Sequence, residues 1–375
     1  MKYYIIAGEA SGDMYGAALM RALRKRDTQA QFRFWGGDAM QGEGGTPVRH
    51  IRTLAIMGFV EVAVHMHEVL ANIALCKRDI DAFHPDVVVG IDYPGFNLRI
   101  EQWAKSRGYR TVHYISPNLW AWKKRRIKQM RRSLDRLCYI LPFEEAFFAA
   151  NDMPQAVYVG HPLLDILHTR PAATTASHPS PHTTSELPVV ALLPGSRRQE
   201  LKNSLPLMAA LARQHPEYRF VVAGMSLLGE ELYNKLIPAE SNIEVVYDQT
   251  YSLLASAIAA VVCSGTATLE TAMFDVPQVV CYRANALSIA IAKAIVSRRI
   301  RYISLVNLIA DKPIVTELIQ GDFRPSRLED EFQKITVDDA NRKRMQAEYS
   351  DMRTLLGNGG ASERTADTIL SLIKV

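Results

Sequence analysis

Residues 189–197 read VVALLPGSR, and residues 259–268 read AAVVCSGTAT. Each stretch is an apolar run that ends in a turn of small residues, and a helical pattern follows it. This pattern predicts a buried strand, a tight glycine turn and a helix start. Backbone N–H groups and the positive dipole at a helix start bind phosphate well. The two stretches therefore predict an α/β domain that binds a nucleoside diphosphate.

The side chains at these turns suit the same ligand. Arg197 presents a guanidinium fork that can hold a diphosphate through two hydrogen bonds. Ser264, Gly265 and Thr266 form the second turn. The Gly-x-x-x-x-Gly-Lys-Ser/Thr spacing is absent, so the site is not a P-loop.

Three further residues extend this nucleotide site. Glu270 follows the second turn, where a carboxylate could accept both ribose hydroxyls; interaction with the helix dipole is the alternative. Arg283 ends the next predicted strand, close enough in topology to contact the same ligand. Asn307 interrupts an apolar run and is a candidate for contact with sugar or phosphate.

Length and composition describe an ordinary globular chain of about two domains. It has 375 residues, 48% hydrophobic and 22% charged, with a formal net charge of +5. Four cysteines without metal-ligand spacing lie in or beside apolar runs, so we expect buried, reduced thiols. No apolar run approaches the roughly 18–20 residues that span a bilayer. We therefore expect a protein that is soluble or lies on a membrane surface.

Apolar runs alternate with helical patterns in both halves of the chain, which predicts parallel sheets covered on both faces. The sequence predicts two doubly wound, Rossmann-like domains facing a central cleft, with the C-terminal helices packed back on the first domain. The expected boundaries are residues 1–168 for the first domain, 169–188 for a linker, 189–345 for the second domain and 346–375 for the closing helices.

Carboxylates follow two predicted strands of the first half. Glu9, Ser11 and Asp13 lie in the turn after the first strand, where they could contact the hydroxyls of an acceptor sugar. The alternative is a plain turn in which Ser11 or Asp13 caps the next helix. Asp92 ends an otherwise apolar strand. A general base there would remove a proton from an attacking hydroxyl, and Glu9 could share this catalytic role.

Two segments suggest contact with lipid. Residues 54–62, with Met57 and Phe59, are too apolar for an exposed loop, so they predict either a core helix or an acyl-chain site. Trp120 and Trp122 precede a strongly basic stretch at 123–132, which is typical of contact with an anionic membrane. A solvated helix is the alternative, and no nucleic-acid-binding signature supports an RNA or DNA partner.

Taken in order, the motifs resemble those of the lipid-A-disaccharide synthases. The resemblance rests on residues 8–13, 57–62, 90–92, 116–122, 193–197 and 264–267 together with Asn307. Each motif is weak alone, but the ordered set is specific, and it extends from the first strand to beyond residue 310. The resemblance implies an inverting, metal-independent glycosyltransferase of the GT-B type that needs no cofactor.

The same resemblance implies the substrates and the site of action. The donor would be UDP-2,3-diacylglucosamine, the acceptor 2,3-diacylglucosamine 1-phosphate, and the products the β-1,6-linked disaccharide and UDP. Such an enzyme works in the cytoplasm at the inner face of the Gram-negative cytoplasmic membrane, and a homodimer remains open. Arg197, Asn307 and Glu9 match functional family positions, whereas Gly95 stands where many members carry a second aspartate, which leaves Asp92 as the candidate base.

Two other functions remain open. A UDP-sugar 2-epimerase shares the two-domain plan, although it needs no lipid surface. A non-catalytic nucleotide-sugar binder on the membrane would bind UDP without needing Asp92.

Overall fold

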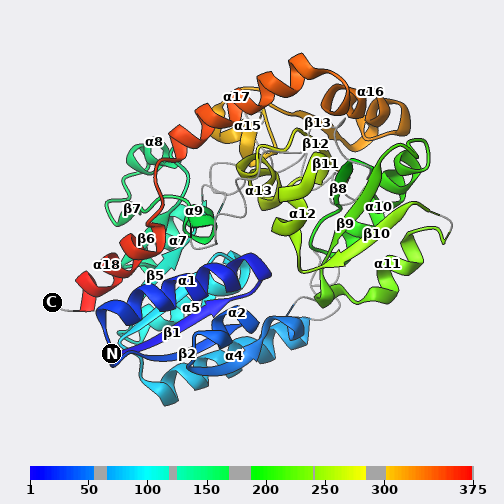
Figure 1. Cartoon of the computed structure of the whole chain (residues 1–375). Coiled ribbons are helices and arrows are strands. Elements are labelled where there is room, and N and C mark those ends of the chain that lie inside the picture. The colour runs from blue at the N-terminus through cyan, green and yellow to red at the C-terminus, as the bar shows by residue number, and fades with distance from the viewer. Residues whose placement is uncertain (55–65, 118–124, 169–186, 240, 284–300, 374–375) are drawn as a thin grey trace. The chain divides into compact units, whose positions relative to one another are not determined.

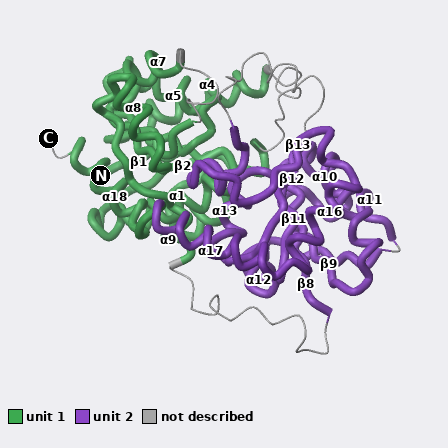
Figure 2. The backbone as a smooth tube through the Cα atoms, turned by 90° about the horizontal axis from the view of Figure 1, so that it is seen from above, with its two compact units in different colours: residues 1–169, 356–375 green, residues 170–355 purple. Residues whose placement is uncertain are grey.

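The computed structural model describes residues 1–54, 66–117, 125–168, 187–239, 241–283 and 301–373 (Figure 1). The chain divides into two compact units. The first comprises Met1–Thr169 with Leu356–Val375, and the second comprises Arg170–Leu355, coloured green and purple in Figure 2.

Within the described part of the first unit, seven parallel strands form one sheet in the order β3-β2-β1-β4-β5-β6-β7. The strands are β1 (Lys2–Ala7), β2 (Gln31–Gly36), β3 (Thr46–His50), β4 (Val87–Ile91), β5 (Arg110–Tyr114), β6 (Arg136–Tyr139) and β7 (Ala156–Tyr158). The helices of this unit are α1 (Ala10–Arg26), α2 (Asp38–Gly42), η1 (Ile51–Thr53), α4 (Met66–Phe83), α5 (Pro94–Ser106), α7 (Arg125–Ser133), α8 (Glu144–Ala150), α9 (Pro162–His168) and α18 (Ala361–Ile373).

The described part of the second unit holds a six-stranded parallel sheet in the order β10-β9-β8-β11-β12-β13. The strands are β8 (Val189–Leu193), β9 (Arg219–Gly224), β10 (Ile243–Tyr247), β11 (Ala257–Cys263), β12 (Gln278–Tyr282) and β13 (Thr316–Ile319). The helices are α10 (Arg198–Ala212), η3 (Ser226–Leu228), α11 (Glu230–Leu236), α12 (Thr250–Ser256), α13 (Thr266–Met273), α15 (Leu305–Ala310), η4 (Gln320–Asp322), α16 (Pro325–Thr336) and α17 (Asp339–Leu356).

The predicted α/β class and parallel sheets are confirmed, as are the apolar central strands. Strands β2, β3 and β13 were not predicted. Strands β3 and β13 are sheet edges, and β3 has no fully buried residue. An edge strand packs on fewer neighbours, so its sequence lacks the continuous apolar run that marks a central strand. The four cysteines are buried and free, as expected.

Both sheets reverse their strand order at one point. In the first unit the reversal lies between β1 and β4, and in the second it lies between β8 and β11. In an open parallel sheet, loops leave the carboxyl ends of such a strand pair in opposite directions, and ligands bind in the crevice that results. The fold therefore predicts one binding position at the carboxyl edge of each sheet.

The two closing helices belong to different units. Helix α18 packs on the first unit, as expected, whereas α17 belongs to the second unit, so the expectation is wrong for α17. The reason is the buried face of α17, where Tyr349 is fully buried and its hydroxyl accepts a 3.3 Å hydrogen bond from Gln278 of β12. Arg353 adds an ion pair with Asp275.

Asp165 of α9 holds the start of α18 in place. Its carboxylate accepts hydrogen bonds from the backbone N–H groups of Gly360, Ala361 (3.2 Å) and Ser362 (2.7 Å). A carboxylate at a helix start satisfies unpaired N–H groups and interacts favourably with the helix dipole. One side chain thus joins segments that lie 195 residues apart.

Replacing Asp165 with Ala is expected to lower the free energy of unfolding by about 1–2 kcal/mol, because three helix-start N–H groups lose their acceptor. All four tryptophans lie in residues 1–169, so a urea titration followed by tryptophan fluorescence reports on the first unit. The control is Asp330→Ala, an exposed position on α16 of the second unit. An unchanged midpoint for Asp165→Ala would contradict the capping role.

Candidate active site

The reversal point of the first sheet brings together two of the predicted carboxylates. Ala7 of β1 pairs with Ile91 of β4, so the turns that carry Glu9 and Asp92 leave neighbouring strand ends. Glu9 is the N-cap residue of α1, and both side chains are partly exposed. Asp92 has a φ of 45°, a conformation that few non-glycine residues adopt. Strain of this kind is concentrated at functional sites.

Tyr93 fixes the spacing of these two turns. Its ring lies over Gly8, where a Cβ atom would overlap the ring carbons, so the position requires glycine. Burial raises the pKa of the Tyr93 hydroxyl, and the nearby Glu9 carboxylate raises it further. The Glu9 carboxylate therefore lies close to the turn that carries Asp92.

Asn97 orients the backbone of the Asp92 turn. Its side-chain amide donates hydrogen bonds to the carbonyl oxygens of Asp92 (2.7 Å), Ile91 (3.2 Å) and Ile6 (3.2 Å). These bonds tie the ends of β1 and β4 together. The Asp92 turn is thus held rigidly at the edge of the sheet.

Asp13 does not face an acceptor. Its carboxylate accepts hydrogen bonds from the backbone N–H groups of Gly37 (2.6 Å), Ala39 (3.0 Å) and Met40 (3.0 Å), and the residue is 5% exposed. It therefore caps α2, because the α1 face carrying Asp13 lies against the end of β2. The suggested acceptor contact is wrong for Asp13, whereas Ser11 in the same turn is partly exposed.

The reversal point of the second sheet brings together the two predicted phosphate turns. Val262 of β11 pairs with Leu193 of β8, so residues 194–197 and 264–266 lie side by side at the carboxyl edge. Arg197 is the N-cap residue of α10, and its side chain is 56% exposed. The guanidinium is therefore accessible to a ligand.

A residue that the sequence analysis missed occupies part of the first turn. The Glu200 carboxylate accepts hydrogen bonds from the N–H groups of Ser196 (2.9 Å) and Arg197 (3.3 Å) and lies 3.7 Å from the Arg197 guanidinium. Gly195 has a φ of 113°, and a Cβ atom there would lie 2.6 Å from the Glu200 Cβ. Only a glutamate at the third helical position signalled this arrangement.

The turn at residues 264–266 has backbone N–H groups that are better placed to bind phosphate than those of the first turn. Helix α13 begins at Thr266, and N–H groups in the first turn of a helix have no acceptor within the helix. A Cβ atom at Gly265 would meet nothing within 4 Å, so the space above this turn is open. The hydroxyl of Ser264 donates to the carbonyl of Ile303 (3.0 Å), which fixes the turn from behind.

Asn307 is engaged inside the protein. It is 1% exposed, and its amide donates to the carbonyl of Val315 (2.9 Å) and to the carboxylate of Glu317 (3.0 Å). Glu317 also accepts hydrogen bonds from the N–H groups of Ile303 and Ser304, each at 2.9 Å. Asn307 and Glu317 therefore position the segment that supports Ser264.

Glu270 lies inside α13 and not at its start. The helix begins at Thr266, so Glu270 is in the second turn, where the dipole acts weakly. The residue is 8% exposed and accepts a 3.2 Å hydrogen bond from Tyr251. Burial raises the pKa of its carboxyl group to about 7.

Arg283 follows β12 and also has protein partners. Its guanidinium donates to the carbonyl oxygens of Phe323 (2.7 Å) and Gln320 (3.4 Å), while its own carbonyl accepts from Asn203 of α10 (2.8 Å). It therefore joins α10 to the segment after β13. The predicted lipid-side residues Met57, Phe59, Trp120 and Trp122 lie outside the described residues.

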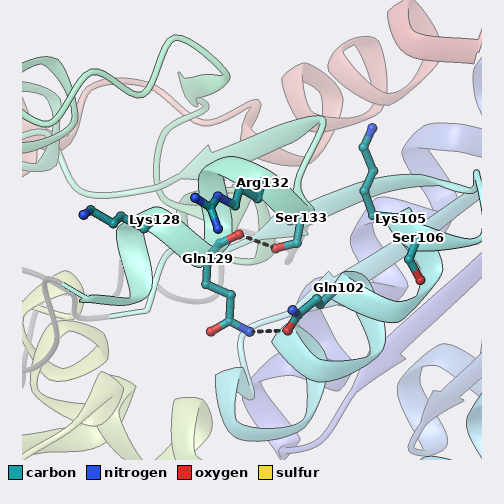
Figure 3. Close-up of a pocket in the computed structure, with 7 residues that line it drawn as sticks. All are labelled: Gln102, Lys105, Ser106, Lys128, Gln129, Arg132 and Ser133. Atoms are coloured by element: carbon teal, nitrogen blue, oxygen red, sulfur yellow. Dashed lines mark hydrogen bonds between the residues drawn. The ribbon is translucent and has the colours of Figure 1, made fainter.

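The basic helix α7 has two unlike faces. Ile127 and Met130 are buried in an apolar cluster with Leu137 and Phe148. A pocket of about 600 Å³ lies between α7 and the C-terminal half of α5 (Figure 3). Its lining residues are Gln102, Lys105, Ser106, Lys128, Gln129, Arg132 and Ser133. Helix α5 begins beside Asp92 and runs back along the sheet, so this pocket lies away from the carboxyl edge.

The described residues include neither a candidate metal site nor a membrane-spanning helix. No cluster of three or more His, Cys, Asp or Glu side chains there could hold a metal ion. Among the helices of the same residues, none has both the length and the apolar character of a membrane span.

Solved structures with a similar fold include a UDP-GlcNAc 2-epimerase from Neisseria meningitidis bound to UDP-GlcNAc, with a TM-score of 0.67, 12% identity and coverage of 99% of this chain and 100% of that one. A calicheamicin glycosyltransferase gives a TM-score of 0.60 at 17% identity, with coverage of 100% of this chain and 98% of that one. At these identities the likeness shows the fold alone, which is that of the GT-B glycosyltransferases and the related epimerases.

Sequence comparison is more specific. The lipid-A-disaccharide synthase of Chromohalobacter salexigens is 36% identical over 383 residues, which cover 100% of this chain and 97% of the relative. The lipid-A-disaccharide synthase of Syntrophus aciditrophicus is 37% identical over 379 residues, covering 99% and 97%. A family model described as lipid-A-disaccharide synthetase matches residues 3–371. The chain therefore belongs to the lipid-A-disaccharide synthase family.

Proposed function

We propose that this protein transfers the diacylglucosamine unit of UDP-2,3-diacylglucosamine to 2,3-diacylglucosamine 1-phosphate, giving the β-1,6-linked disaccharide 1-phosphate and UDP. The family match over residues 3–371 carries this proposal. The strand-order reversal in each sheet supports it, because such points commonly bind ligands and both carry candidate residues.

The donor binds to the second unit. Its diphosphate lies at the start of α13, where backbone N–H groups point outward, and Arg197 neutralises the charge that develops on the leaving group. Asn307, Glu317 and Arg283 act indirectly, because their bonds to the protein hold this edge of the sheet in shape.

The acceptor binds to the first unit. Asp92 accepts the proton of the acceptor's 6-hydroxyl as that oxygen attacks the anomeric carbon of the donor. The bond from the anomeric carbon to the diphosphate oxygen breaks, and the electron pair leaves with UDP. Attack from the side opposite the diphosphate inverts the anomeric configuration. Glu9 lies at the neighbouring strand end, where it contacts the acceptor sugar.

The reaction proceeds without a metal ion in this proposal, because Arg197 and the α13 dipole stabilise the leaving diphosphate. Incubation with both acylated sugars is expected to give a disaccharide, detected by mass, and one equivalent of UDP, with the same yield when EDTA is present. Chelator sensitivity would contradict the metal-free mechanism.

The same assay separates the alternatives. Production of an epimer or of free UDP from UDP-GlcNAc alone would favour an epimerase. Binding of UDP without any product would favour a non-catalytic binder.

We also propose that the exposed face of α7 binds an anionic membrane surface, which would place the enzyme at the inner face of the cytoplasmic membrane. Lys128, Arg131 and Arg132 are exposed on this helix, while its apolar face is buried. The double variant K128E/R132E is expected to weaken binding to phosphatidylglycerol vesicles by at least about tenfold, since each basic residue near such a surface contributes about 1 kcal/mol. The control K235E/K343E reverses two exposed lysines of the second unit.

A further inference from the structure

A buried ion pair lies beneath the Asp92 turn, and the mechanism above does not use it. Glu101 of α5 and His113 of β5 are in contact, with 2.7 Å between Glu101 Oε1 and His113 Nδ1. Both side chains are 0% exposed. Burying two ionisable groups is costly, so a buried pair is weak evidence of a stabilising role.

The strand register places this pair beside the strand end that carries Asp92. His113 pairs in register with Gly90, so the side-chain positions of 90 and 113 lie on one face of the sheet, two residues before Asp92. A Cβ atom at Gly90 would overlap the Glu101 carboxylate. Because Gly90 has no side chain, Glu101 of α5 has room to contact His113.

Three polar atoms around Gly90 have no hydrogen-bond partner among the described residues. They are Asn97 Oδ1, Glu101 Oε2 and His113 Nε2, and all are buried. A Cβ atom at Gly90 would lie 2.9 Å from the Asn97 Cβ, so Asn97 belongs to the same cluster. Buried polar atoms without partners are costly, so three of them around one glycine call for an explanation.

The charges that face His113 come from three elements. Burial opposes the charged imidazole, but Glu101 of α5 and, to a smaller extent, Asp92 after β4 raise the pKa of His113 above its ordinary value. Arg126 of α7 acts in the opposite direction. His113 therefore interacts electrostatically with the proposed base.

We propose that Glu101 and His113 are positioning residues for Asp92, an inference that rests on the proposed function. Glu101 holds the imidazole with a hydrogen on Nδ1 and stabilises its charged form. The imidazolium in turn favours the ionised form of Asp92, so that this carboxylate is ready to accept the proton of the acceptor hydroxyl. Neither Glu101 nor His113 touches a substrate in this arrangement.

The first test is the pH dependence of kcat in His113→Gln and Glu101→Gln. Without the imidazolium, the ionised form of Asp92 is less favoured than its protonated form. The acid limb of the pH profile of kcat is therefore expected to move to higher pH by about one unit, as for loss of a nearby opposite charge. We expect kcat to fall roughly tenfold, part of the roughly 10²–10⁴ that a positioned base contributes. The KM for the donor is expected to stay unchanged, because the donor binds to the second unit.

The matched control is His215→Gln. His215 also forms a histidine–glutamate pair, with 2.7 Å between its Nε2 and Glu329 Oε2, but it lies in the second unit between α10 and α16. Its profile is expected to coincide with that of the unchanged protein. If folded His113→Gln or Glu101→Gln also gave the unchanged profile, the positioning role would be overturned.

A second measurement does not depend on activity or on the two buried variants. Titration of ¹⁵N-histidine-labelled protein by NMR follows the imidazole of His113 directly. Asp92→Asn removes a negative charge from a partly exposed position, so the pKa of His113 is expected to fall. An unchanged His113 titration in Asp92→Asn would overturn the inference. Absence of disaccharide formation in the unchanged protein would instead overturn the proposed function.

Discussion

Asp92→Asn is expected to reduce kcat by about 10²–10⁴-fold, the range that a positioned general base contributes. The amide keeps the shape of the carboxylate but cannot accept the proton of the acceptor hydroxyl. Binding of UDP, measured by calorimetry, is expected to stay unchanged because the donor contacts are on the other unit. Turnover is followed by mass detection of the disaccharide.

Asp86→Asn is the matched control, because Asp86 precedes the same strand at its opposite end. Its carboxylate accepts a 2.7 Å hydrogen bond from the backbone N–H of Lys2. This substitution removes the same charge far from the carboxyl edge, so activity is expected to remain close to normal. Equal activity of the two variants would rule out Asp92 as the base.

Arg197→Ala is expected to reduce turnover by about 10²–10³-fold, by analogy with the loss of one donor to a developing anion. The side chain is 56% exposed, so folding should be retained. Arg197→Lys is expected to give an intermediate rate, since an ammonium keeps the charge but lacks the two-pronged geometry. Steady-state kinetics with saturating donor measures the effect.

The control for Arg197 is Arg213→Ala at the other end of α10. Arg213 is exposed at the C-terminus of that helix, at the opposite edge of the sheet from the phosphate turns. Near-normal turnover of Arg197→Ala would refute its role in stabilising the leaving group.

The turns at the two reversal points could be predicted because the local sequence pattern is enough to identify them. A wholly apolar strand followed by glycine and a helix start predicts where a parallel sheet ends, and Asp92 and Arg197 stand at such ends. Few strand orders then remain possible, because crossovers between parallel strands are almost always right-handed and consecutive elements usually lie side by side.

The partners of the side chains could not be predicted in this way. Asp13 caps a helix that begins 25 residues later, Asn307 donates to Glu317 of β13, and Glu200 occupies N–H groups that were expected to bind phosphate. Glu101 and His113 look like ordinary helix and strand positions until α5 is laid across Gly90. These contacts depend on packing between elements, which no periodicity in the sequence records.

The return of α18 to the first unit has a consequence for synthesis on the ribosome. Residues 361–373 leave the ribosome only after the second unit, so the first unit cannot be completed before the second unit has been synthesised. Until then the Asp165 carboxylate and the cations of α1 that pair with Glu363 and Asp367 lack their partners. A premature stop codon near residue 360 would leave the first unit without the helix that packs on β5 and β6.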